Sequence, residues 1–304
     1  MNVLSLFDGI SCGQIALERA NIKVDNYYAS EIDNNSIKVT QTNYPNTIQL
    51  GDVSNYKEWD LPKIDLLIGG SPCQGFSSAG KQLNFSDPRS KLFFEYVEVL
   101  KLLKKKNPNL LFLLENVAMK QEWIDIISDL LGVQPIEINS YLVSAQYRVR
   151  LYWTNIPGVE LPIDKGIKLE SILEDKIYTN KASIVGRRID KDGHRKDNNK
   201  DLDIVQCLEV RDFFRDKSNC LTTVDKDNVV TSLGIGRHFD AYGKKGYNIK
   251  LPFRYLTRLE YERLQTVPDG YTSCIKESYA KKALGNGWTV DVIAHIFSYI
   301  QKEE

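Results

Sequence analysis

The sequence lacks both a long apolar run and a surplus of charge. No apolar stretch approaches the ~20 residues that a membrane-spanning helix needs, so we expect no membrane partner. Forty basic side chains balance forty acidic ones, and the formal net charge is +0. This balance argues against a protein that holds nucleic acid by bulk charge, but it allows a localised basic face. One stretch could be such a face or a plain solvated loop; its basic residues are Lys181, Arg187, Arg188, Lys191, Arg195, Lys196 and Lys200.

Cysteines are few and scattered, at positions 12, 73, 207, 220 and 274. No two of them form a CxxC pair, so the sequence indicates neither a structural metal site nor a disulfide framework. We therefore expect no metal and a reducing cytoplasm, and the first residues carry no basic leader typical of secretion. A chain of 304 residues with 42% hydrophobic and 26% charged residues fits a globular protein of one or two domains.

The first half alternates strand-like runs with helical patterns. The strand-like runs are 3–7, 27–30, 48–50, 64–68, 110–114 and 136–143, and the helical patterns are 14–19, 34–43, 91–105 and 122–131. This alternation predicts βαβ units, hence an α/β fold with a mostly parallel sheet and helices on both faces.

The residue pattern changes after Asn155–Gly158. Polar runs, short strands and frequent turns there indicate a smaller, irregular, β-rich domain. Helical patterns return at 257–265 and 290–299. We predict three parts: a first domain over 1–157, a second over 158–251, and a segment over 252–304 that returns to the first domain.

Two reactive side chains follow two predicted buried strands. Cys73 comes just after the strand that ends in Gly69-Gly70-Ser71, and Glu115 follows the run 110–114. Parallel sheets bind ligands beyond the carboxyl ends of their strands, so both side chains could face one pocket. There the thiol can attack a carbon, and the carboxyl can donate or hold a proton.

The ends of the first three strands indicate a ligand that contains adenosine. The first strand runs into Phe7-Asp8-Gly9, but the GxGxxG fingerprint of dinucleotide sites is absent. Glu31 could bond ribose hydroxyls and Asp52 an adenine amino group, although each could also be a turn or N-cap acid. Together these positions favour S-adenosylmethionine over a dinucleotide.

In order along the chain, the motifs resemble those of the bacterial and phage DNA (cytosine-5) methyltransferases. The resemblance covers both ends of the chain and fails over the middle. It rests on Phe7-x-Gly9, Glu31, Asp52, Gly70-Ser71-Pro72-Cys73-Gln74-Gly75-Phe76-Ser77, Glu115-Asn116-Val117, Gln146-x-Arg148-x-Arg150, Arg254-x-Leu256-Thr257-x-x-Glu260-x-x-Arg263-Leu264-Gln265 and Gly285-Asn286-Gly287.

The resemblance implies a Rossmann-like methyltransferase sheet and a covalent reaction. The Cys73 thiolate would add to carbon 6 of a cytosine flipped out of duplex DNA, and carbon 5 would take a methyl group from S-adenosylmethionine. Glu115 would bond ring nitrogen 3 and the exocyclic amine. Arg148 and Arg150, expected on one face after a strand at 143–145, would supply positive charge, although in isolation they could be a surface pair.

The resemblance also implies cofactor contacts from many loops, including a turn at Gly285–Trp288 before a final helix. These contacts are Phe7, Gly9, Cys12, Gly13, Glu31, Ile32, Asp52, Val53, Pro72, Leu92, Asn286 and Trp288. Many relatives have Ser-Val after the asparagine, where this chain has Gly287-Trp288. Trp288 could therefore be a core aromatic instead.

The region 158–251 would be the target recognition domain. Candidate DNA contacts are Gln74, Ser77, Arg187, Arg188, Arg211, Arg215 and Arg237. We expect a monomer that acts on double-stranded DNA, with a separate restriction endonuclease as a candidate partner. Two alternatives are a transfer RNA methyltransferase of the same family and a non-catalytic relative, and the presence of Cys73, Glu115, Arg148 and Arg150 argues against the latter.

Overall fold

The structure, a computed structural model, describes most of the chain. The described residues are 1–72, 91–188, 190, 192, 194–211, 216–239 and 251–300. Four predicted site residues lie outside them: Cys73, Gln74, Ser77 and Arg215. Their assignments therefore stay predictions from sequence.

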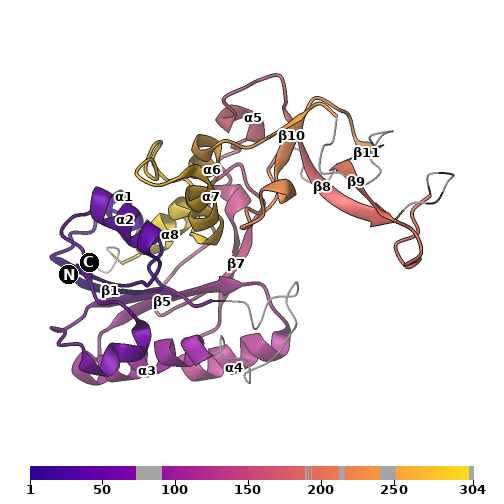
Figure 1. Cartoon of the computed structure of the whole chain (residues 1–304). Helices are drawn as coiled ribbons and strands as arrows, with labels where there is room; N and C mark the ends of the chain where they lie inside the picture. The colour runs from indigo at the N-terminus through magenta and orange to yellow at the C-terminus, as the bar shows by residue number, and fades with distance from the viewer. Residues whose placement is uncertain are drawn as a thin grey trace.

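A seven-stranded sheet forms the first domain, with strand order β3-β2-β1-β4-β5-β7-β6 (Figure 1). The strands are β1 Asn2–Leu6, β2 Asn26–Ser30, β3 Ile48–Gln49, β4 Leu66–Gly70, β5 Leu111–Val117, β6 Ile136–Asn139 and β7 Val149–Thr154. All pairs among β1 to β5 are parallel, whereas β7 runs antiparallel to both β5 and β6. The ends of β1, β2, β4 and β5 therefore meet at one edge of the sheet.

Helices cover both faces of this sheet, as the alternating pattern predicts (Figure 1). One face carries α1 Cys12–Arg19, α2 Asn34–Asn43 and α8 Val290–Phe297, and the other carries α3 Lys91–Lys106 and α4 Gln121–Leu131. Side chains of β1 alternate accordingly: Val3 packs with the first group, and Leu4 and Leu6 pack with the second. The predicted α/β class is confirmed.

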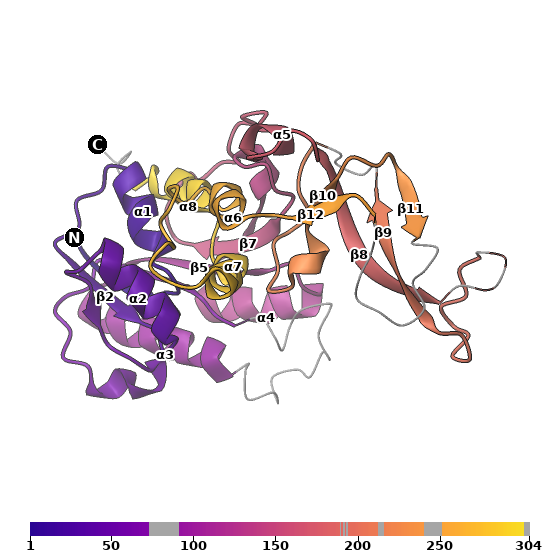
Figure 2. The same cartoon turned by 45° about the horizontal axis from the view of Figure 1, so that its top comes forward.

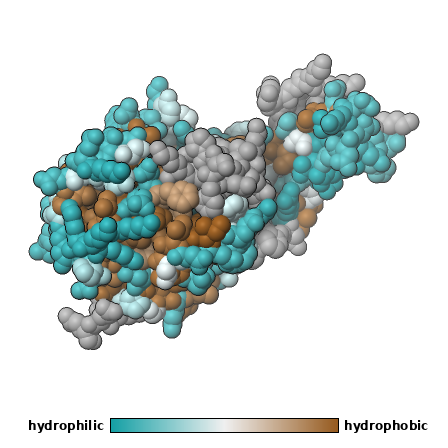
Figure 3. Space-filling view, turned by 90° about the horizontal axis from the view of Figure 1, so that it is seen from below, coloured by the Kyte–Doolittle hydropathy of each residue, from teal (hydrophilic) through white to brown (hydrophobic). Residues whose placement is uncertain are grey.

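The outer face of α3 and α4 carries apolar surface between charged side chains (Figure 3). The exposed apolar residues on these two helices are Leu102, Ile126 and Leu130. None of the described helices is both long and apolar enough to cross a membrane.

The predicted strand 136–143 is too long, and the expected strand at 143–145 is absent. β6 ends at Asn139, whose side-chain oxygen accepts hydrogen bonds from the backbone of Tyr141 (3.2 Å) and Arg148 (3.0 Å). These bonds favour a 3₁₀ turn, Ser140–Leu142, in place of a strand. Arg148 consequently lies just before β7, and Arg150 lies within it.

The C-terminal part contains α6 Arg258–Leu264, α7 Glu277–Asn286 and α8. The sequence interpretation missed α7, because Gly285 and Asn286 suggested a turn. Gly285 is instead a helical residue at a close contact: a Cβ built there would lie 2.4 Å from the carbonyl oxygen of Thr222. The glycine is needed for packing against the second domain.

A five-stranded antiparallel sheet forms the second domain, with order β11-β9-β8-β10-β12 (Figure 2). Its elements are α5 Leu169–Ile172, β8 Asn180–Arg188, β9 Ile204–Val210, β10 Val229–Thr231, β11 Gly236–Phe239 and β12 Phe253–Tyr255. One face packs a small apolar cluster that includes Ala182, Ile184 and Leu208. β12 joins this sheet although it lies within the segment 252–304 that we expected to return to the first domain.

Candidate active site

The loop between β1 and α1 is bent by unusual backbone angles. Phe7, Gly9 and Ser11 all have positive φ, at 57°, 59° and 58°. For Phe7 and Ser11 this conformation costs energy, so the surroundings must hold it. Glu31, after β2, does so by accepting a 2.8 Å hydrogen bond from the backbone N–H of Gly9.

Asp8 is a second anchor of this loop. Its carboxylate accepts hydrogen bonds from the hydroxyl of Tyr27 (2.7 Å) and from that of Ser11. Burial raises the pKa of Asp8 to about 6; these hydrogen bonds oppose the shift, and the nearby Glu31 carboxylate adds to it. Asp8 of this loop and Glu31 after β2 therefore place two carboxyl groups beside the same site.

Glu31 and Asp52, which we expected to bond the ribose and the adenine, also make the local hydrogen bonds of a turn or N-cap acid. Glu31 accepts from the backbone N–H groups of Ile32 and Asp33, each at 2.8 Å. Asp52 caps the 3₁₀ helix Val53–Glu58 by accepting from the backbone of Ser54 at 2.8 Å. A carboxylate has more lone pairs than these bonds use, so the capping roles leave room for a ligand.

A cavity of about 340 Å³ lies between the β1–α1 loop, the ends of β4 and β5, and α7. Ten of the predicted site residues line it: Phe7, Gly9, Cys12, Glu31, Pro72, Glu115, Arg148, Arg150, Asn286 and Trp288. Five predicted cofactor residues are not in its lining: Gly13, Ile32, Asp52, Val53 and Leu92. Gly13 instead packs closely against Ile68 and Tyr27, Val53 is buried, and Ile32 is exposed.

Glu115 lies within β5, opposite Gly70 of β4, and its carboxylate is held from two sides. The Nε of Arg150 lies 3.0 Å from one oxygen, and the indole N–H of Trp288 donates to the other at 3.2 Å. Gly70 makes this possible, because a Cβ there would lie 2.8 Å from the indole nitrogen and 3.0 Å from the carboxylate. The hydrogen bond of Trp288 to Glu115 was not predicted from sequence.

The two arginines make different contacts. Arg148 is buried and donates to the backbone carbonyls of Leu221 (3.0 Å), Gly287 (2.9 Å) and Gly285 (3.4 Å). Burial, and then the charge of Arg150, lower the pKa of Arg148. Burial alone would lower the pKa of Arg150, but the Glu115 carboxylate together with Cys220 and Tyr152 outweighs it, and the net effect raises the pKa of Arg150. Arg148 thus joins three chain segments, and Arg150 faces the carboxylate.

Cys220, which sequence analysis did not assign to the site, lies beside both guanidinium groups. Its sulfur is 3.4 Å from Arg148 and 3.8 Å from Arg150. Cys220 belongs to the loop after residue 215 in the second domain, so this contact places that loop at the rim of the cavity. Nothing in the sequence spacing indicates this proximity.

The chain leading to Cys73 is anchored next to Glu115. Ser71 is buried, and its hydroxyl accepts a 3.1 Å hydrogen bond from the side chain of Asn116. Pro72, the last described residue before Cys73, lines the cavity. The strand ends that sequence analysis paired are therefore adjacent.

Three of the predicted DNA-contacting arginines share one acid that sequence analysis missed. Arg187, Arg211 and Arg237 approach the carboxylate of Glu209 at 2.9, 2.7 and 3.3 Å. Burial alone would raise the pKa of Glu209, but the hydrogen bonds and the charges of Arg187 and Arg211 together outweigh it and lower the pKa. Arg188 differs and donates to the backbone carbonyl of Leu202 at 3.2 Å.

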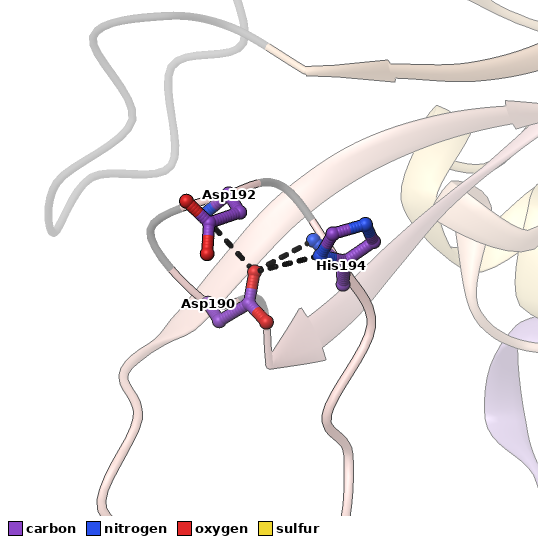
Figure 4. Close-up of side chains that lie close together, drawn as sticks. All are labelled: Asp190, Asp192 and His194. Atoms are coloured by element: carbon purple, nitrogen blue, oxygen red, sulfur yellow. Dashed lines mark hydrogen bonds and ion pairs between the residues drawn. The ribbon is translucent and has the colours of Figure 1, made fainter.

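Beyond β8, Asp190, Asp192 and His194 lie close together (Figure 4). Asp190 accepts hydrogen bonds from the backbone N–H of Asp192 (3.1 Å) and of His194 (2.8 Å), and lies 3.6 Å from the His194 ring. This pattern is that of a side chain closing a turn. We therefore assign the group to the structure of the β8–β9 connection.

The family model for the C-5 cytosine-specific DNA methylases matches residues 1–122 and 144–302. Among curated relatives, the type II methyltransferase M1.ScrFI of Lactococcus lactis subsp. cremoris is 29% identical over 96% of this chain and 75% of its own length. The type II methyltransferase M.NgoBV of Neisseria gonorrhoeae is 30% identical over 62% of this chain and 50% of its own length.

Solved structures share the fold at lower identity. The Entamoeba histolytica methyltransferase EhMeth has a TM-score of 0.66 and 18% identity, covering 99% of this chain and 97% of its own. A DNMT2 mutant from Spodoptera frugiperda has a TM-score of 0.63 and 19% identity, covering 98% of this chain and 99% of its own.

Proposed function

Because the chain belongs to the family of C-5 cytosine-specific DNA methylases, we propose that it methylates carbon 5 of a cytosine in double-stranded DNA. The observation that carries the proposal is the shared cavity. Its lining contains both the β1–α1 loop and Glu115, so a methyl donor and a target base can meet there. Its volume of about 340 Å³ is within the range of small-ligand sites.

The donor set of the cavity fits S-adenosylmethionine. Asp8 and Glu31 offer carboxylates at the loop where a dinucleotide site would offer backbone N–H groups to phosphate. Two acids repel a pyrophosphate but favour a ligand that carries positive charge. We propose that Phe7, Gly9, Asn286 and Trp288 complete this site, with Glu31 bonding the ribose. Asp52 would bond the adenine from outside the cavity lining.

S-adenosylmethionine, when bound, supplies the methyl group. The thiolate of Cys73 forms a bond to carbon 6 of the cytosine, and the electron pair of the ring double bond moves toward carbon 5. Glu115 accepts an N–H bond from the exocyclic amine and gives a proton to ring nitrogen 3 as this electron pair moves, and it takes that proton back when the ring is restored. After carbon 5 has gained its methyl group, a base removes its proton and the carbon–sulfur bond breaks, which restores the ring and the thiolate.

Arg150 and Trp288 keep Glu115 oriented during this cycle. Each uses one lone pair on a different oxygen of the carboxylate, which leaves lone pairs on both oxygens for the base. Arg148 also adds positive charge near the site, which favours the thiolate over the thiol.

DNA would contact the second domain, with Arg187, Arg188, Arg211 and Arg237 as its basic residues. We further propose that the protein serves a restriction–modification system or protects a phage genome. Its relatives include the two type II methyltransferases above and the orphan methyltransferase M.SPRI of Bacillus phage SPR, which is 42% identical over 38% of this chain and 26% of its own length.

A direct test incubates the purified protein with labelled S-adenosylmethionine and either plasmid DNA or transfer RNA. We expect label in DNA, followed by bisulfite sequencing that locates it at cytosines in one short sequence. Label in RNA alone would contradict the proposal and favour the transfer RNA alternative. Binding of the cofactor without transfer to either substrate would favour a non-catalytic relative.

A further inference from the structure

Glu209 is the shared acceptor of three arginines in the second domain. Its Oε1 lies 2.9 Å from Nε of Arg187 and 3.3 Å from Nε of Arg237. Its Oε2 accepts two bonds from Arg211, from Nε at 3.2 Å and from Nη2 at 2.7 Å. The Glu209 side chain is only 5% exposed, whereas those of Arg211 and Arg237 are 64% and 50% exposed. The carboxylate is thus enclosed while two of its arginines reach solvent.

Strand pairing places this cluster on one face of the second sheet. Ser183 of β8 is directly opposite Glu209 of β9, which in turn is opposite Arg237 of β11. Arg187 and Arg211 lie at even spacing from Ser183 and Glu209, and side chains two residues apart share a face. The other face is the apolar one, where Ile184 pairs with Leu208. The arginine face is therefore not the face that stabilises the domain by apolar burial.

A chain of contacts connects the arginine face to the catalytic carboxylate. Ser183 accepts a 3.2 Å hydrogen bond from Asn219, whose neighbour Cys220 contacts Arg150. Arg150 pairs with Glu115. The face and the cavity therefore border the same loop, and a duplex whose target base enters the cavity would pass the arginines.

The cluster is better suited to recognition than to stability. Ion pairs to half-exposed arginines contribute little to stability, because solvent screens them. Three arginines around one acid leave two surplus positive charges, and a shared acceptor limits the rotamers of long side chains. Arg237 contacts Glu209 through Nε, so within the described part of the chain its paired Nη groups remain for a ligand. A guanidinium fixed in this way is preorganised for two parallel hydrogen bonds, such as those to a guanine edge.

We propose that Glu209 is a positioning residue for sequence recognition: it fixes Arg187, Arg211 and Arg237 so that they discriminate between base sequences beside the target cytosine. This inference rests on the proposed DNA methylation. It assigns a carboxylate, which would itself repel DNA, to the task of orienting the groups that bind it.

The test uses the full chain with the variant Glu209→Gln, and Asp201→Asn as a matched control. Asp201→Asn removes one negative charge from the same domain, as Glu209→Gln does. Asp201 is exposed and has no ion pair among the described residues, so its loss should disturb no arginine. The sequence that the wild type methylates is found first by bisulfite sequencing. Then kcat/KM is measured on a duplex with this sequence and on duplexes with one altered base pair.

We expect Glu209→Gln to lower the preference for the cognate duplex by at least ~10-fold, the usual scale of one lost base contact. The affinity of the variant for DNA of unrelated sequence should stay the same or rise, because a negative charge has been removed. Asp201→Asn should keep the preference of the wild type. If Glu209→Gln keeps it too, or loses activity equally on every duplex, the inference is wrong.

A second variant covers the case in which Glu209→Gln fails to fold. Arg237→Lys alters a half-exposed side chain, keeping its charge but losing the paired donors, and it should lower the same preference. An unchanged preference in that variant would also overturn the inference. Failure of the proposed function is distinguishable, because then the wild type itself would label no DNA.

Discussion

Glu115 is the residue whose surroundings say most about the site. Arg150 and Trp288 hold its two oxygens, and Gly70 leaves the space that Trp288 and the Glu115 carboxylate need. The sequence predicted Glu115 and Arg150 as site residues, but it predicted Trp288 as a cofactor contact or a core aromatic, not as a partner of Glu115. Trp288 is 173 positions from Glu115, and no spacing rule connects residues that far apart.

Removing the indole donor should slow catalysis without removing the cofactor site. Trp288→Phe keeps an aromatic ring but loses one hydrogen bond to a charged group, so we expect kcat to fall by about 10-fold. Glu115→Gln should cost on the order of 100-fold or more. If Trp288 acts through Glu115, the double variant will be no slower than Glu115→Gln alone, and fully additive losses would contradict this coupling.

Cys73 carries the covalent step in our proposal. Cys73→Ser should abolish methylation, because a serine hydroxyl is not ionised near neutral pH, while circular dichroism and cofactor binding stay those of the wild type. Trapping of a protein–DNA adduct with a cytosine analogue blocked at carbon 5 gives a second measurement. Full activity of the serine variant would refute the covalent mechanism.

Asp8 should make stability depend on pH in a particular direction. Its pKa is about 6 in the folded protein against 3.8 for an ordinary aspartate. A raised folded pKa contributes stability below about pH 4, and this contribution is lost as pH rises through 6. Relative to Asp8→Asn, the wild type should therefore lose up to roughly 3 kcal/mol of unfolding free energy between pH 4 and 7.

Urea unfolding of both proteins at several pH values measures this difference. An equal offset between them at pH 4 and pH 7 would show that Asp8 does not titrate in this range. Tyr27 and Ser11 donate to different oxygens of Asp8, so in the asparagine variant one hydroxyl keeps a carbonyl acceptor and the other can accept from the amide group. The variant thus keeps the shape of the side chain and removes its charge.

At the scale of elements, strand ends and helices followed largely from sequence, because apolar periodicity is a local property. α2 has the predicted bounds, 34–43. The errors lie where a side chain or a packing contact overrides the local pattern: Asn139 ends β6 early, and Gly285 belongs to a helix. Arg148 then connects β7 to the end of α7 and to the loop at Leu221.

The contact between α7 and that loop predicts a destabilising variant. Gly285→Ala would place a methyl group 2.4 Å from the carbonyl oxygen of Thr222, so backbone must move. We expect a loss of ~1–3 kcal/mol in the free energy of unfolding, measured with urea. Gly234→Ala, at a glycine with open space around it, is the matched control and should change stability much less.

At the scale of the whole molecule, the cavity is assembled from distant parts of the chain. Its lining comes from the first loop, the ends of β4 and β5, and α7 near the C-terminus. A ligand there must therefore stabilise the entire first domain, because it touches segments from both halves of the sequence.

Ligand-dependent unfolding tests this arrangement. S-adenosylhomocysteine should raise the melting temperature, and at 100 times its Kd it should add ~2.7 kcal/mol to stability. NAD⁺ at the same concentration should have no effect, because Asp8 and Glu31 repel its phosphates. Stabilisation by NAD⁺ alone would contradict the assignment of the cavity.

The sequence by itself determined the α/β class, the order of the motifs and the reactive residue types, because each is written in local patterns or in a linear order. Only the tertiary structure decided which partners those residues have. Three contacts depend on how sheets and helices pack: Trp288 with Glu115, Cys220 with Arg148 and Arg150, and Glu209 with the three arginines of the second domain. Contacts between residues far apart in the chain arise from that packing, and no local pattern encodes them.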